Sequence, residues 1–265
     1  SPNIMNKLER SVLSLYSYDN NPDDISIENV LRQSVQLIAQ LPMIMTYAYQ
    51  VKRRHYLKKS MYIHPIKPEL STAETILYNT RSNRKFTDEE AKLLDICLML
   101  HAEHGGGNNS AFATRVLSSS GTDTYAAISA GIGALKGPRH GGANLKVAEM
   151  INCMKEDVSD ITNEGQVADF LKKIINKQAG DRSGLVYGMG HAVYTLSDPR
   201  QIILKREALK LAEKKGFGDD FKALELIERL TPEVFASEKK NTKKICANVD
   251  LYSGLVYDML GIPKE

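Results

Sequence analysis

Helical periodicity runs through almost the whole chain and limits its fold more than any other feature. Apolar residues recur at spacings of three and four, and no stretch alternates between apolar and polar residues over more than a few positions. The pattern predicts an all-α protein with more than two-thirds of its residues in helices. We expect helices at the following residues: 3–18, 26–54, 71–80, 87–103, 109–119, 123–136, 144–156, 164–178, 198–215, 219–230 and 250–260.

Local signals set some of these boundaries. Thr87 is followed three residues later by Glu90, which is the spacing of a capping box at a helix start. Pro42 lies inside the segment 26–54 and predicts a kink there. No repeat or low-complexity linker divides the chain, so the turn GPRHGG at 137–142 is the best candidate for a domain boundary.

The composition is that of an ordinary soluble globular protein, since 42% of the 265 residues are hydrophobic and 25% are charged. The Lys and Arg residues behind the net charge of +3 are mixed with Asp and Glu, so we expect no nucleic-acid partner. We find neither a signal peptide nor an apolar run of about 18 residues, and therefore expect a cytoplasmic protein without a membrane partner. Cys97, Cys153 and Cys246 form no CxxC pair and predict reduced thiols.

A histidine stands between a Gly-Pro pair and a Gly-Gly pair in GPRHGGAN, residues 137–144. Glycines alone would make a turn, so an imidazole where backbone can approach closely indicates a ligand or a reaction. A helix is expected to start at Asn144, and its N–H groups favour a neutral imidazole that can donate a hydrogen bond to a developing enolate. The structural alternative is that His140 only caps this helix.

Two further histidines, His101 and His104, are three residues apart at one helix end and therefore share a face. The HExxH zinc motif needs a spacing of four, and no cysteine or further histidine lies nearby in the sequence, so we expect no metal site. One of the two histidines is expected to be packed and the other to point into a site.

Residues 185–200 and the last helix supply the remaining candidates. His191 lies nine residues before Arg200 in Asp-Pro-Arg, a pattern that favours anion binding, whereas GMGHAV lacks the third glycine of a dinucleotide-binding motif. Asp250 opens the apolar stretch DLYSGLVYDML. It either caps that helix or, with His140 and His191, acts as a base that removes a proton next to a carbonyl group.

Four segments together, HAEHGGGNNS, GPRHGGAN, GMGHAVYTLSDPR and NVDLYSG, resemble the citrate synthase family, including the 2-methylcitrate synthases. The resemblance covers nearly the whole chain. It implies part of a large helical domain at 1–139, a small helical domain at 140–255, a return to the large domain at 256–265 and an active site in the cleft between them. The family extends beyond both ends of these residues, so we expect a truncated chain that is weakly active or inactive by itself.

The resemblance also implies roles for individual residues in a condensation of acetyl-CoA with oxaloacetate. Asp250 is the base, while His140 and His191 polarise the thioester and the ketone. Oxaloacetate is bound by His104, His191, Arg200 and Ser110. Coenzyme A is bound by the following residues: Leu185, Val186, Gly188, Gly190, Ala192, Lys243 and Asn248. The resemblance implies a homodimer, and coenzyme A enters as a thioester substrate, so we expect no separate cofactor.

Three other interpretations stay open at this point. The protein could be a 2-methylcitrate synthase that uses propionyl-CoA, or a non-catalytic helical module that binds an acyl-CoA or a carboxylate. It could also be a helical scaffold whose histidines and glycines are only caps and turns. The scaffold interpretation predicts that the candidate residues do not come together in space.

Overall fold

The computed structural model describes residues 1–102, 105–138, 140–191, 194–240 and 244–264. These residues are 64% helical and include no β-strand, so the predicted all-α class is confirmed and the expected helical fraction was slightly too high. The helices are α1 (Ile4–Leu15), α2 (Ile27–His55), α3 (Thr72–Thr80), α4 (Asp88–His101), α5 (Asn109–Ser118), α6 (Thr124–Leu135), α7 (Ala143–Asp157), α8 (Glu164–Ile175), α9 (Pro199–Lys215), α10 (Gly218–Lys239) and α11 (Asp250–Met259), with a 3-10 turn at Tyr16–Tyr18.

Side-chain caps fix most of the helix starts. The predicted capping box is present at α4, where Thr87 accepts a hydrogen bond from the N–H of Glu90 and the Glu90 side chain accepts one from the N–H of Thr87. Glu90 is buried and also pairs through both carboxylate oxygens with Arg81, at 2.8 and 3.1 Å. Ser71 and Glu74 form a second capping box at α3.

Two long helices, α2 with 29 residues and α10 with 22, each contain a proline. The expected end of α10 at residue 230 was wrong, because the helix continues past Pro232 to Lys239. Ile227, Leu230 and Val234 lie on one buried stripe that runs through the proline, so burial outweighs the hydrogen bond that proline cannot donate. Within the described ranges, no helix is both long and apolar enough to cross a membrane.

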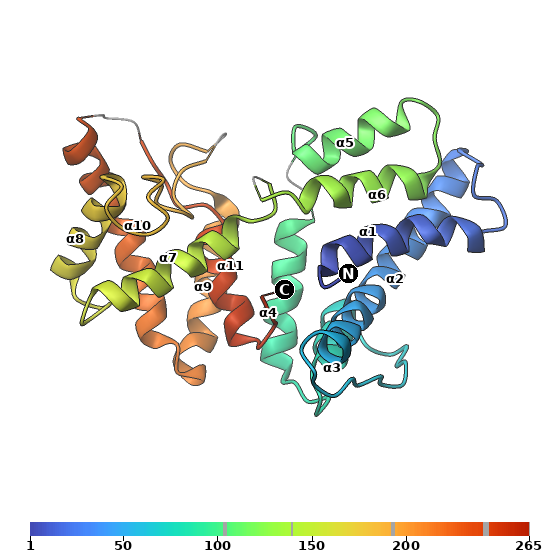
Figure 1. Cartoon of the computed structure of the whole chain (residues 1–265), viewed down its shortest axis with the longest axis horizontal. Coiled ribbons are helices and arrows are strands. Elements are labelled where there is room, and N and C mark those ends of the chain that lie inside the picture. Colours follow the sequence, from blue (N-terminus) through green and yellow to red (C-terminus); the bar gives the residue numbers. More distant parts are fainter. Residues whose placement is uncertain (103–104, 139, 192–193, 241–243, 265) are drawn as a thin grey trace. The chain divides into compact units, whose positions relative to one another are not determined.

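The chain divides into two compact units. The first, Ser1–Gly141, contains α1 to α6, and α6 packs against both α1 and α5 (Figure 1). Val12, Leu37 and Tyr125 form a buried cluster that joins α1, α2 and α6. The last helix of this unit, α6, ends at Leu135 and is followed by the turn that contains His140.

The second unit, Gly142–Lys264, contains α7 to α11. Here α11 packs against α7 and α9, and α10 packs against α8 and α9 (Figure 1). Tyr252 of α11 is fully buried, and its hydroxyl donates to Glu228 of α10 at 2.6 Å. The helix that begins at Asp250 is therefore anchored by apolar packing and by a buried hydrogen bond.

Candidate functional site

The turn that carries His140 needs glycine at position 141. A Cβ atom on Gly141 would lie 2.2 Å from the carbonyl oxygen of Leu135, so only glycine fits there. The N–H groups of His140 and Gly141 both donate to the carbonyl of Gly137, at 3.0 and 3.2 Å. The backbone of the turn is thus closed onto the end of α6, and the imidazole is held at a fixed place.

The imidazole of His140 contacts the N-terminus of α5. Its Nε2 lies 2.8 Å from the hydroxyl of Ser110 and accepts a hydrogen bond from the N–H of Ser110 at 3.3 Å. A ring nitrogen that accepts from an N–H carries no proton, so this contact favours the tautomer of His140 that has its proton on Nδ1. The sequence had pointed to the helix at 144, which begins at Ala143, whereas this N–H comes from α5, thirty residues earlier in the chain.

The loop that holds Leu185, Val186, Gly188 and Gly190 is joined to residues 246–248. Gly190 donates to the carbonyl of Cys246 at 2.7 Å, and the N–H of Asn248 donates to the carbonyl of Gly188 at 2.9 Å. Gly188 has a φ of +80°, and a Cβ there would lie 2.8 Å from the Cα of Leu251. Both segments expected to bind coenzyme A are therefore parts of one small structure beside α11.

Asn248 also sets the start of α11. Its Nδ2 donates to the carbonyl of Gly190 at 2.8 Å, and its Oδ1 accepts the N–H of Asp250 at 3.0 Å. The N-cap position of α11 is Val249, and Asp250 is the first helical residue. The interpretation of Asp250 as the N-cap residue is wrong, so capping does not explain why a carboxylate stands there.

His191 and Arg200 are brought together in the second unit. The Nδ1 of His191 accepts the N–H of Tyr194 at 3.0 Å, which leaves Nε2 as the proton-bearing nitrogen of the neutral ring. Nη2 of Arg200 lies 3.4 Å from this Nε2. A guanidinium group can only donate, so His191 Nε2 and Arg200 Nη2 are two donors that lie close together. This arrangement suits an acceptor oxygen of a bound anion.

The sequence predicts only a helix start at Asp198, but the structure shows that its side chain belongs to this site. It is fully buried and accepts hydrogen bonds from Arg200 at the backbone N–H, at Nε and at Nη2. Burial alone would raise the pKa of Asp198, but the hydrogen bonds from Arg200 outweigh burial and hold this pKa below its usual range. The same pairing raises the pKa of Arg200, with a smaller contribution from Asp250.

The structure thus gathers the predicted residues into two groups, one in each unit. His140 and Ser110 are in contact in the first unit. The predicted residues in the second unit are Leu185, Val186, Gly188, Gly190, His191, Arg200, Asn248 and Asp250. Three predicted residues, His104, Ala192 and Lys243, lie outside the described residues.

His101 is hydrogen-bonded to its own helix and, in the part of the chain that the structure describes, is not part of a metal-ligand cluster. Its Nδ1 donates to the carbonyl of Cys97 at 2.7 Å, so the side chain closes the end of α4. Among the described residues, no three His, Cys, Asp or Glu side chains are grouped so that they could hold a metal ion.

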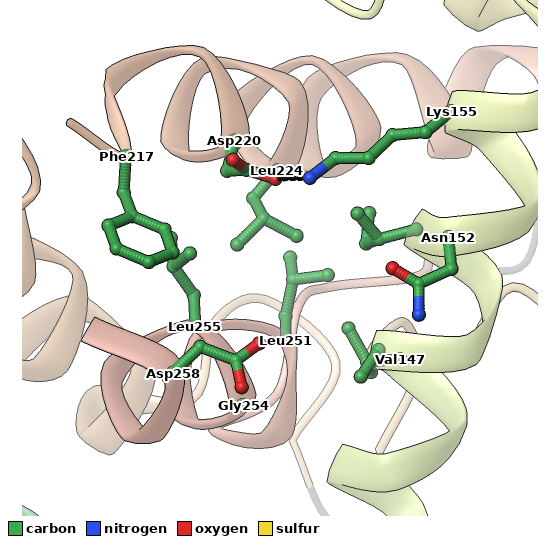
Figure 2. A pocket seen from close by; sticks show the side chains of 12 residues that line it. Val147, Asn152, Lys155, Phe217, Asp220, Leu224, Leu251, Gly254, Leu255 and Asp258 are labelled. Atoms are coloured by element: carbon green, nitrogen blue, oxygen red, sulfur yellow. Dashed lines mark ion pairs between the residues drawn. The ribbon is translucent and has the colours of Figure 1, made fainter. Parts of the chain in front are cut away.

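A small cavity of about 70 Å³ lies elsewhere in the second unit, between α7, α10 and α11 (Figure 2). Its walls are mainly apolar, and an ion pair between Lys155 and Asp220 closes one side. Burial raises the pKa of Asp258, which also lines it. None of the residues predicted for catalysis or binding lines this cavity, and its volume suits a few water molecules rather than a coenzyme.

Similarity to known proteins identifies the family of this chain. The family model described as "Citrate synthase, C-terminal domain" matches residues 1–265. The chain belongs to the citrate synthase family. The citrate synthase of Corynebacterium glutamicum is 33% identical over 262 residues, which are 96% of this chain and 55% of that protein. The citrate synthase of Deinococcus radiodurans is 34% identical over 261 residues, 98% of this chain and 63% of that protein.

Solved structures of citrate synthases share the fold. The enzyme from Pyrobaculum aerophilum superposes with a TM-score of 0.76 at 26% identity, covering 98% of this chain and 62% of that one. Citrate synthase from Thermoplasma acidophilum, solved in a ternary complex with carboxymethyl coenzyme A and oxaloacetate, superposes with a TM-score of 0.74 at 26% identity, covering 98% of this chain and 62% of that one. This member of the citrate synthase family therefore spans between half and two-thirds of the length of these relatives.

Proposed function

We propose that this chain carries the central part of a citrate synthase, which condenses acetyl-CoA with oxaloacetate to give citrate and free coenzyme A. The observation that carries the proposal is the pair of donors formed by His191 Nε2 and Arg200 Nη2, 3.4 Å apart. A 2-oxo dicarboxylate offers a ketone oxygen and a carboxylate to these two groups. Arg200 suits the carboxylate because its planar fork can donate two parallel hydrogen bonds.

The reaction begins at the methyl group of the thioester. The Asp250 carboxylate takes a methyl proton, and the neutral His140 donates a hydrogen bond from Nδ1 to the thioester oxygen as negative charge develops there. The hydrogen bond from the N–H of Ser110 to Nε2 supports this role, because it favours the tautomer with the proton on Nδ1. The enolic carbon then attacks the ketone of oxaloacetate, which His191 polarises, and hydrolysis of the resulting thioester releases coenzyme A.

The remaining expected roles are part of the same proposal. The loop from Leu185 to Gly190 and Asn248 bind coenzyme A, together with Ala192 and Lys243, while His104 binds oxaloacetate. Ser110 acts through His140 and lines the oxaloacetate site. We propose no metal and no cofactor apart from the coenzyme A thioester.

We also propose that the protein is a homodimer that pairs through the first unit. Exposed apolar side chains follow one face of α2, where Ile27, Leu31 and Ile38 are 86%, 63% and 65% exposed. Phe112 and Val116, one turn apart on α5, are 58% and 49% exposed. Apolar rows of this kind are typical of surfaces that become buried in an assembly.

Thiol-release kinetics test the proposed reaction on the protein as the cell makes it. We expect oxaloacetate-dependent release of coenzyme A from acetyl-CoA, with citrate as the product. Faster release from propionyl-CoA than from acetyl-CoA would instead support a 2-methylcitrate synthase. Binding of oxaloacetate or acetyl-CoA without any thiol release would contradict the proposal and favour a non-catalytic binding module.

A further inference from the structure

One buried carboxylate connects the starts of two helices in the second unit. The oxygens of Asp198 accept from Arg200 at the backbone N–H and Nε, both at 3.0 Å, and at Nη2 at 2.7 Å. Oδ2 also accepts the N–H of Val249 at 3.3 Å, from a residue 51 positions later in the chain. Asp198 is completely buried, whereas the Arg200 side chain keeps 15% of its exposure.

This set of contacts exceeds what a helix cap requires. The N-cap residue of α9 needs one hydrogen bond to a backbone N–H, and the bond from the N–H of Arg200 supplies it. The bonds to Nε and Nη2 fix the plane of the guanidinium group. The bond from Val249, the N-cap residue of α11, ties the same carboxylate to the residue that precedes Asp250.

We propose that Asp198 is a positioning residue that holds the substrate-binding Arg200 and the backbone of the base Asp250 in one fixed arrangement. This inference rests on the proposed function. The N–H of Nε and one N–H of Nη2 donate to Asp198, so only the remaining N–H groups of the guanidinium can donate to a substrate. The base stands directly after Val249, so the same carboxylate constrains where proton removal takes place.

The charge of Asp198 predicts how a variant would change kcat relative to the KM for oxaloacetate. Arg200 carries a buried counter-ion before any substrate arrives, so loss of that negative charge does not weaken the attraction between Arg200 and an anionic substrate. Loss of the charge does weaken the hydrogen bonds that fix the plane of the guanidinium and the bond from Val249 at the start of α11. Turnover is therefore expected to suffer more than substrate affinity, which is the reverse of the loss expected when Arg200 itself is removed.

The test compares Asp198→Asn with Asp123→Asn in the protein as the cell makes it. Asp123 is the N-cap residue of α6 and accepts the N–H of Ala126, so it controls for capping alone. We expect Asp198→Asn to lower kcat by roughly 10- to 100-fold, as misplaced catalytic groups do, with a KM for oxaloacetate within a few-fold of wild type. The control is expected to leave both constants unchanged, and Asp198→Glu to recover part of kcat.

A second variant covers the case in which Asp198→Asn does not fold. Val249 has a φ of −60°, which proline can adopt, so Val249→Pro removes the N–H donor and leaves the pairing with Arg200 in place. We expect kcat to fall while the KM for oxaloacetate is unchanged. An unchanged kcat in either folded variant overturns the proposal while the proposed function stands. A wild-type protein without oxaloacetate-dependent thiol release overturns the proposed function, and this inference with it.

Discussion

Replacement of Asp19 by alanine is expected to destabilise the first unit strongly. The Asp19 side chain is 2% exposed. It accepts hydrogen bonds from the Tyr125 hydroxyl at 2.6 Å, from Arg32 Nη2 at 2.7 Å, from Gln33 Nε2 at 3.0 Å and from the N–H of Asn21 at 3.0 Å. These partners come from α2, α6 and the loop after α1, so one carboxylate joins three parts of the unit.

The size of the loss follows from the partners that alanine would leave behind. Tyr125 is 2% exposed, so its hydroxyl could not turn to water, whereas the Arg32 side chain is 46% exposed and could. Nε2 of the buried Gln33 would keep the carbonyls of Asn21 and Pro22 as acceptors, at 3.3 and 3.4 Å. A buried donor without an acceptor costs about 1–3 kcal/mol. The Tyr125 hydroxyl is one such donor, so the expected loss is about 1–3 kcal/mol in the free energy of unfolding.

Urea denaturation of Asp19→Ala and Asp23→Ala measures this loss against a matched control. Asp23 also accepts a tyrosine hydroxyl, that of Tyr16 at 2.9 Å, but this pair is exposed. We expect a clear drop in the unfolding midpoint for Asp19→Ala and a much smaller change for Asp23→Ala. Equal losses in the two variants would refute the argument that burial of the partners sets the cost.

The dependence on pH gives a second measurement of the same group. Hydrogen bonding, above all from Tyr125, holds the pKa of Asp19 well below its usual range. A lowered folded-state pKa means that the contribution of Asp19 is complete above its unfolded-state value of about 4 and is lost as the pH falls below it. Wild type is therefore expected to lose stability more steeply than Asp19→Ala below pH 4.

Further variants test the site and its scaffold. Asp250→Asn is expected to lower kcat by roughly 10²-fold or more with nearly unchanged oxaloacetate binding, because a positioned base is lost, and equal effects on both would contradict this. Arg200→Ala is expected to raise the KM for oxaloacetate strongly in steady-state assays, since a carboxylate loses its partner. Gly188→Ala should destabilise the protein more than Gly261→Ala in thermal unfolding, because both have positive φ but only at Gly188 would a Cβ meet backbone.

The helices could be predicted from the sequence because their signals are local. The capping box of α4 needs only Thr87 and Glu90, and both lie within one turn. The end of α10 could not be predicted in this way. Continuation past Pro232 depends on the burial of Val234 against the rest of the unit, which is a tertiary effect.

In the candidate site, too, local motifs could be predicted from the sequence and tertiary contacts could not. Sequence motifs pointed to His140, His191, Arg200 and Asp250, but not to the contacts that orient them. The hydrogen bond from Ser110 to His140 spans thirty positions, and that from Val249 to Asp198 spans 51. Asp198 was visible only as a good helix cap, because the sequence cannot reveal that its second oxygen reaches another helix.

The most direct test of the proposed chemistry is a double-mutant cycle between His140 and Asp250. These residues belong to different units, yet the proposal has them act on the same thioester in one step. Groups that act together lose most of their effect when either is removed, so kcat of His140→Ala/Asp250→Asn is expected to match that of the slower single variant. A double variant whose loss equals the product of the two single losses would contradict the account.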